Sequence, residues 1–407
     1  MTSRLLLFAL LAALPMSVTA QDIAVRGEIV HTMAGAPIFD GVVIVRDGKI
    51  AAVGPAGATP IPQGMEVRSA SVVTPGLVDA HTTVGLAGIY NVDAGNDERD
   101  ESEALQPELR AIDSYNPREP LVEWLRSFGI TTVHTGHAPG AVITGQTMVA
   151  KTWGNNVEAA TLRPAAMLNV TLGDGATASG KEKPGTRAVA MAILRQALVD
   201  ARTYRDGMAA EDASDRPDRD LRKEALARCL DGELSLLVTV HRHHDILGAL
   251  RLAREFEVPL VLDGAAEAYM VLDEIKAAGV PVIAHPAMMR TDPPPSVTAN
   301  ATMELAALLK KAGIPFAQQS GYEGYVPRVR VLLLEAAIAG RYGLDFAANL
   351  SSITLDAARI IGVDDRVGSL EVGKDGDIAL YDGDPFEYTT HCVGAIIEGV
   401  VVSEETR

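Results

Sequence analysis

The chain has 407 residues, of which 47% are hydrophobic and only 4% are aromatic, so its core must consist chiefly of aliphatic side chains and alanine. Such a core suits parallel strands that are buried on both faces. The formal net charge is −17, from 53 acidic and 36 basic residues. This charge repels phosphate groups, which argues against nucleic acid or an anionic membrane surface as a partner. The two cysteines, Cys229 and Cys392, are too few for a disulfide scaffold, and we expect two buried free thiols.

The first 20 residues predict a signal peptide. A short positively charged start is followed by an almost wholly apolar run over 5–15, and Val18-Thr19-Ala20 presents small residues at the positions that a signal peptidase reads. The alternative is a buried helix of the mature fold. The apolar run is too short to span a bilayer, and no later run of about eighteen apolar residues follows it. We therefore expect a periplasmic or secreted protein with no membrane span after cleavage.

Both ends of the mature chain resemble small β-sheets. Apolar runs at 42–46 and 49–53 flank Asp47-Gly48, a strong hairpin signal. Residues 368–381 and 394–402 have the same character. The sequence thus predicts four parts: the signal peptide at 1–20, a first part of a composite β-sandwich at 21–73, a barrel at 74–364, and the second part of the sandwich at 365–407.

The middle of the chain alternates strand-like and helical runs, which is typical of a parallel α/β architecture. Helices are expected near 121–128, 246–256, 270–278 and 303–312, and a polar insertion occupies 172–232. Eight strands are expected at 72–80, 131–135, 147–151, 165–170, 236–241, 259–263, 281–285 and 315–320. The predicted fold class is therefore α/β, a (β/α)₈ TIM-type barrel with a composite β-sandwich domain. An open, doubly wound sheet is the alternative.

Histidines gather where the predicted strands end. Active sites of such barrels lie at the carboxyl ends of the strands, and imidazoles there can bind a metal or transfer protons near neutral pH. A single histidine is more often a hydrogen-bonded structural residue, so the grouping is the informative signal. Asp263 also ends a predicted strand. Seven of the nine histidines belong to this group: His81, His134, His137, His241, His243, His244 and His285.

Residues 73–81, Val-Thr-Pro-Gly-Leu-Val-Asp-Ala-His, resemble the first-strand signature of the amidohydrolase superfamily, in its imidazolonepropionase-like and prolidase-like branch. Residues 129–133, 354–359 and 368–384 resemble the second strand, the final helix and the return to the composite sheet. The resemblance implies a hydrolase of carbon–nitrogen bonds in amides or cyclic amides, other than peptide bonds. It implies a small-molecule substrate and a zinc ion, or another divalent metal, that activates water. Barrels of this type often pair, which leaves a homo-oligomer open.

The metal ligands that the resemblance implies are only partly present. The family's second first-strand histidine is replaced by Thr83. The strand-eight aspartate is expected within Gln318-Gln319-Ser320-Gly321, which holds no carboxylate, and Gly321 has no side chain. The matching ligands are His81 and His241, fewer than the three protein ligands that catalytic zinc usually keeps. Asp263-Gly264 replaces the strand-six histidine. Strand four carries Asn169 instead of a bridging lysine, and Lys151 on strand three is a weak substitute.

Three hypotheses follow. The favoured one is a divergent metal-dependent hydrolase, because a decayed site has no reason to gather imidazoles. Its catalytic residues would be Asp263 and His285, and its site would be rebuilt from these two with His81, His241, and His134 or His137. Its substrate-binding residues would be His134, His137, Tyr322 and Arg328, and the arginine could pair with a substrate carboxylate. The second is an inactive barrel that binds a small molecule or a partner protein in the periplasm, which the missing strand-eight carboxylate favours. The third is a metal-free hydrolase with Glu323 or Asp263 as base.

Overall fold

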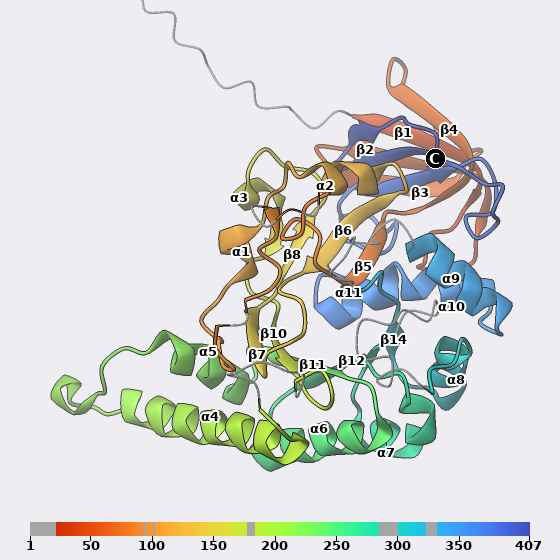
Figure 1. Cartoon of the computed structure of the whole chain (residues 1–407). Helices are drawn as coiled ribbons and strands as arrows, with labels where there is room; N and C mark the ends of the chain where they lie inside the picture. Colours follow the sequence, from red (N-terminus) through yellow and green to blue (C-terminus); the bar gives the residue numbers. More distant parts are fainter. Residues whose placement is uncertain are drawn as a thin grey trace, which may run out of the picture.

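The computed structural model describes residues 22–90, 92, 95–100, 102–176, 184–284, 300–322 and 332–407. The predicted signal peptide lies outside the described residues. Figure 1 shows a β-rich domain that contains the C-terminus at one end of the molecule and helices α4, α6 and α7 at the other, with the remaining strands between them. Across the described ranges, no helix combines the length and apolar character that a membrane crossing requires.

Strands from both chain ends share one seven-stranded sheet in the order β17-β16-β15-β4-β1-β2-β3. β4 and β15 pair antiparallel at the junction, with Ile378 opposite Pro75. Asp47 and Gly48 have φ angles of 49° and 76° and form the predicted hairpin turn between β2 and β3. The composite domain of the predicted fold class is therefore confirmed. Its strands are β1 (Ile23–Val30), β2 (Ile38–Arg46), β3 (Lys49–Pro55), β4 (Glu66–Pro75), β15 (Ile378–Tyr381), β16 (Cys392–Ile397) and β17 (Val400–Ser403).

The middle of the chain forms two further sheets, ordered β14-β13-β12-β11-β10-β7 and β5-β6-β8-β9. Backbone hydrogen bonds join them at both seams: Gly321 N donates to His81 O over 3.2 Å, and Thr147 N donates to Met167 O over 2.9 Å. Eight of these strands lie where the sequence predicts them. The strands are β5 (Leu77–Thr82), β6 (Ile130–Thr135), β7 (Ile143–Gln146), β8 (Met148–Lys151), β9 (Thr161–Arg163), β10 (Met167–Thr171), β11 (Ser235–Val240), β12 (Leu260–Gly264), β13 (Val282–Ala284) and β14 (Phe316–Ala317).

Two details differ from the sequence prediction. β8 runs antiparallel to β6, and β7 antiparallel to β10, so the predicted third strand does not continue the parallel pattern. The predicted first strand is divided between two domains: β4 belongs to the composite sheet and β5 to the barrel, with Gly76 between them. A Cβ at Gly76 would lie 2.2 Å from Oγ1 of Thr131, so only glycine lets the chain pass this close to β6.

Helices cover the parallel strands, and several end as the sequence suggests. α7, α8 and α11 each end before a glycine with a left-handed backbone. The insertion forms α4 and α5, which lie side by side in Figure 1. The α-helices are α1 (Ala111–Ser114), α2 (Pro120–Arg126), α3 (Val157–Ala160), α4 (Arg187–Met208), α5 (Leu221–Leu230), α6 (His243–Phe256), α7 (Leu272–Ala278), α8 (Leu305–Ala312), α9 (Leu332–Arg341), α10 (Phe346–Ser352) and α11 (Leu355–Ile361).

The parallel strands bury both faces. Leu236, Val238 and Val240 of β11 share a large core with the helices, whereas Leu237 shares a second core with Val261 of β12. Because side chains alternate along a strand, Thr239 and Asp263 continue the row of Leu237 and Val261. These two polar residues are opposite each other in the register of β11 and β12. The period of the strands thus brings a carboxyl group into the interior beside a hydroxyl group.

Candidate active site

Asp263 is the fully buried carboxylate at the end of β12. Thr239 Oγ1 donates to its Oδ2 over 2.6 Å, and Gln319 Nε2 donates to its Oδ1 over 2.9 Å. Burial by itself raises the pKa of Asp263, but the charge of His81 and the hydrogen bonds from His81, Thr239 and Gln319 outweigh burial and lower the pKa below its ordinary value. The carboxylate is therefore held ionised inside the protein.

His81 at the end of β5 is the partner of this carboxylate. Its Nδ1 lies 3.0 Å from Oδ1 of Asp263, and both side chains are fully buried. Within the described part of the chain, neither ring nitrogen of His81 makes a hydrogen bond of good geometry, although Nδ1 lies this close to the carboxylate. The ring of Tyr322 lies against the imidazole, with 5.2 Å between ring centroids. The structure thus brings together three residues that the sequence proposed for a site, from three different strand ends.

His134 on β6 has an internal role in this structure. Its Nδ1 is 2.7 Å from the carbonyl oxygen of Ala80, and its Nε2 is 2.7 Å from Oγ1 of Thr147. Burial and the neighbouring charge of His81 lower the pKa of His134 to about 3, so the ring is neutral. Both nitrogens are used by the protein itself. This histidine ties β5 and β6 to the segment before β8, instead of offering a nitrogen to a substrate.

His241 and His137 are also buried, at the ends of β11 and β6. A Cβ at Gly264 would lie 2.5 Å from Cε1 of His241, so the glycine beside Asp263 makes room for this ring. Burial lowers the pKa of His241 against the raising effect of Asp263, Asp174 and Glu267, and burial likewise lowers the pKa of His137. The carbonyl oxygen of His137 accepts a 2.6 Å hydrogen bond from Nδ2 of Asn169. Both imidazoles are therefore kept neutral.

The other predicted residues divide into two groups. His243 and His244 begin α6 with half-exposed side chains, and Nδ1 of His243 lies 2.7 Å from Oε2 of Glu267. His285, Arg328 and Glu323 lie outside the described residues. The roles proposed for His285 and Arg328 therefore stay predictions.

Asp79 is a second buried carboxyl group near the site, and the sequence reasoning gave it no role. Ser320 binds it with both its backbone N–H, over 3.0 Å, and its hydroxyl group. Burial raises the pKa of Asp79 to about 6, although the bonds from Ser320 act in the opposite direction. Its position in the first-strand signature was a signal that could have drawn attention to it. Asp79 links β5 to the residues that follow β14.

The described donor set does not fit a metal ion. No three histidine, cysteine, aspartate or glutamate side chains within the described ranges group closely enough to hold one. The carboxylate oxygens of Asp263 already accept hydrogen bonds from Gln319 and Thr239, and Thr83 and Gly321 supply no imidazole or carboxylate. Lys151, the substitute for a bridging lysine, instead lies 2.7 Å from Asp375 and belongs to the contact with the composite domain.

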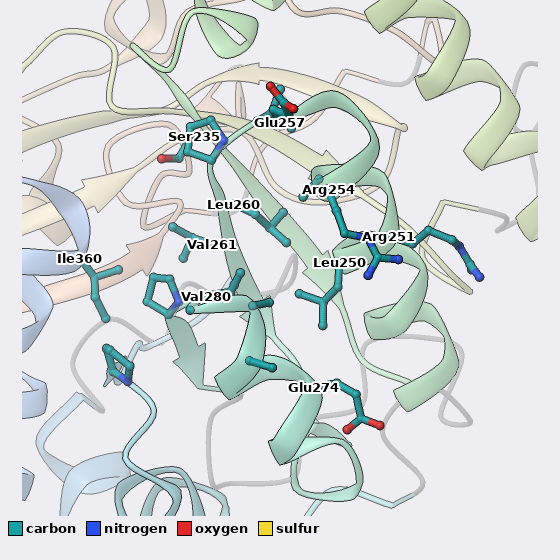
Figure 2. A pocket seen from close by; sticks show the side chains of 18 of the residues that line it. Ser235, Leu250, Arg251, Arg254, Glu257, Leu260, Val261, Glu274, Val280 and Ile360 are labelled. Carbon is teal, nitrogen blue, oxygen red and sulfur yellow. The ribbon is translucent and has the colours of Figure 1, made fainter.

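A surface hollow of about 1110 Å³ lies at the opposite end of the parallel strands. Figure 2 shows Ser235 at the start of β11 and Leu260 at the start of β12 on its wall. Pro281 and Pro315, which precede β13 and β14, also line it. In barrels of this kind chemistry takes place at the carboxyl ends of the strands, so this hollow is separate from the pair of His81 and Asp263.

Comparison with known proteins agrees with this architecture. The sequence profile of the amidohydrolase family matches residues 119–403. An amidohydrolase of Thermotoga maritima has a crystal structure that superposes with a TM-score of 0.88 at 27% identity, over 94% of this chain and 100% of that one. The imidazolonepropionase of Rhizorhabdus wittichii is 25% identical over 88% of this chain and 92% of its own length. Amidohydrolase tasK of Hapsidospora irregularis is 25% identical over 80% of this chain, which spans only 36% of that longer protein.

One of the more distant structural neighbours contains a bound zinc ion. An adenosine deaminase from Xanthomonas campestris with bound zinc superposes with a TM-score of 0.55 at 16% identity, which shows the shared fold alone. Members of the superfamily generally use a divalent metal. The predicted fold class, a TIM-type barrel with an additional β-sandwich domain, is confirmed by these relatives. The chain belongs to the amidohydrolase family, in its imidazolonepropionase-like branch, and is a hydrolase of carbon–nitrogen bonds.

Proposed function

We propose that the protein is an exported hydrolase that opens a small cyclic amide, or cleaves a small linear amide, at the carboxyl ends of the barrel strands. The observation that carries the proposal is the buried pair of His81 and Asp263, held by hydrogen bonds from Thr239 and Gln319. An imidazole beside an ionised carboxylate is a group that can move the proton of an attacking water. The proposal includes no metal, because the described donors do not fit one.

The substrate class is supported by the relatives. Several matched proteins are imidazolonepropionases, whose name denotes a substrate with an imidazolone ring, which contains a cyclic amide. Export is supported by the sequence of residues 1–20 alone. The negative charge of the chain disfavours strongly anionic substrates such as nucleotides, because phosphates would be repelled on approach.

The alternative function is an inactive barrel that binds a small molecule or a partner protein. Thr83 and Gly321, which replace two expected ligands, favour this alternative. Purified mature protein should be assayed against a panel of five- and six-membered cyclic amides and N-acyl amino acids. We expect turnover of at least one cyclic amide that is lost in His81→Asn and kept in His391→Asn, a histidine of the composite domain. Ligand-induced thermal shifts without any turnover would favour the binding barrel.

Export has its own test. The full chain should be expressed in a Gram-negative host, the cells fractionated, and the N-terminus of the recovered protein sequenced. We expect the protein in the periplasmic or extracellular fraction, beginning at Gln21, because cleavage after Ala20 follows the small residues of the predicted signal peptide. Recovery of an uncleaved chain from the cytoplasm would contradict this part of the proposal.

A further inference from the structure

We infer that His81 is the general base of this hydrolase, that Asp263 orients it, and that the pair works without a bound metal ion. The inference rests on the proposed function and adds the mechanism by which the site activates water. It concerns residues at four barrel strand ends, which this chain combines in place of the family's ligand set.

Contacts from three side chains fix the orientation of the Asp263 carboxylate. Oδ1 of Asp263 faces Nδ1 of His81 at 3.0 Å and accepts from Gln319 at 2.9 Å, while Oδ2 accepts from Thr239 at 2.6 Å. All four side chains are at most 5% exposed. The negative charge of this carboxylate, 3.0 Å from Nδ1, favours the tautomer in which Nδ1 carries the proton. The lone pair of His81 then resides on Nε2.

Nε2 is the atom that the protein leaves for the reaction. It is buried and makes no hydrogen bond to the described residues; Nδ1 makes none of good geometry either, but lies 3.0 Å from Oδ1 of Asp263. Buried polar atoms are almost always paired, and leaving one unpaired costs free energy, so such an atom calls for an explanation. His134, whose ring centroid is 5.8 Å from that of His81, uses both of its nitrogens internally. Of these two neighbouring imidazoles, only His81 retains a nitrogen for a water or a substrate.

The same contacts explain why the pair replaces a metal. A metal ion between His81 and Asp263 would need the lone pair of Nδ1 and that of Oδ1, but these atoms lie within hydrogen-bond distance of each other. Thr239 and Gln319 already occupy further lone pairs of the carboxylate. Each feature that holds Asp263 as the partner of an imidazole thus makes it a poorer metal ligand.

Hydrolysis at this site passes through a tetrahedral intermediate. A water oxygen forms a bond to the amide carbonyl carbon, the electron pair of the C=O π bond moves to the oxygen, and Nε2 of His81 takes a proton from the water. The tetrahedral intermediate then collapses, the C–N bond breaks, and the imidazolium returns the proton to the leaving nitrogen. One amide and one water become one carboxylic acid and one amine, and His81 ends neutral. Asp263 stabilises the transient imidazolium.

The kinetic test compares the buried pair with a matched exposed one. His391 Nδ1 and Asp382 Oδ2 in the composite domain are 2.9 Å apart and half-exposed, so His391→Asn and Asp382→Asn control for loss of a histidine–aspartate contact. We expect Asp263→Asn to lower kcat by roughly 10³–10⁴-fold, with little change in KM. Thr239→Val, which removes one bond to Asp263, should lower kcat roughly three- to tenfold. Added imidazole should partly restore the activity of His81→Gly. Equal losses in the control variants, or no rescue, would overturn the inference.

Two measurements do not depend on turnover. In the proton NMR spectrum of the wild type we expect a downfield imidazole Nδ1 proton that disappears in His81→Asn and Asp263→Asn but persists in His391→Asn. Zinc titration of chelator-treated protein should show no stoichiometric site that His81→Asn abolishes. Chelation should leave kcat unchanged. If hydrolysis occurs but needs zinc bound through His81, the inference fails while the proposed function stands. If no amide is hydrolysed, both fall.

Discussion

Lys151 is the cation that holds two buried carboxylates between the barrel and the composite domain, and its removal should be costly. Its Nζ lies 2.7 Å from Asp375, 3.1 Å from Asp377 and 2.8 Å from Glu398, with only 4% of the side chain exposed. Asp375 would keep Lys49 and Arg366. Among the described residues, Asp377 has no other ion-pair partner, so Lys151→Met leaves a buried charge uncompensated. We expect a loss of about 3–5 kcal/mol in the free energy of unfolding.

The loss should depend on pH in a defined direction. Burial raises the pKa of Asp377, the charge of Lys151 lowers it, and the charge of Asp375 raises it, with a net upward shift. Removing Lys151 should raise this pKa further. A carboxyl group with a raised pKa in the folded state binds more protons folded than unfolded, so its protonation stabilises the folded state as pH falls. The deficit of Lys151→Met should therefore be largest near pH 8 and shrink towards pH 5.

Urea unfolding at several pH values measures this effect, with the midpoint and slope compared to the wild type. The matched control is Arg195→Met, which removes an ion pair to Glu255 at 2.8 Å in which both side chains are about 40% exposed. The control should cost less than about 1 kcal/mol at every pH. A Lys151→Met loss as small as the control, or one that grows as pH falls, would refute the reasoning.

Further predictions concern three buried positions. The pKa of Asp79 is about 6 in the folded state, so this carboxyl group gives the wild type added stability as pH falls from 7 to 4. Asp79→Asn should remove that component, which urea unfolding across this range would show. Gly264→Ala should cost about 1–3 kcal/mol by thermal unfolding, because the residue has φ +74° and the new Cβ would lie 2.5 Å from the ring of His241; equal stability would contradict this packing. Cys229 and Cys392 are free and buried, as expected, with the pKa of each thiol raised by burial to about 12. Alkylation at pH 8 should therefore modify neither until the protein is unfolded, as mass spectrometry can show.

The strands could be predicted from the sequence because each is a short aliphatic run, and the composite sheet because turn signals such as Asp47-Gly48 are local. The direction of β8 could not be predicted from the sequence, because a strand of four residues carries no signal for parallel or antiparallel pairing. The role of His134 was equally hidden. Its partners, the carbonyl of Ala80 and the hydroxyl of Thr147, come from other strands and become neighbours only in the folded barrel. The position of the histidines at strand ends predicted that they would lie close together. It did not predict which ring nitrogens would contact other groups of the protein itself.

The arrangement around Asp263 bears on whether the divergence of this site reflects decay or replacement. Burying a carboxylate is expensive unless hydrogen bonds and polar contacts compensate. Here His81, Thr239 and Gln319 supply that compensation from three other strand ends. Gln319 lies within 318–321, where the family's aspartate is expected, and Asp263 lies in the neighbourhood where a histidine is expected. Residues on two ligand-bearing strands therefore meet in one network around the carboxylate of Asp263. A site that had only lost its ligands would have no reason to keep an ionised carboxylate buried there, so the network favours replacement of the chemistry over its loss.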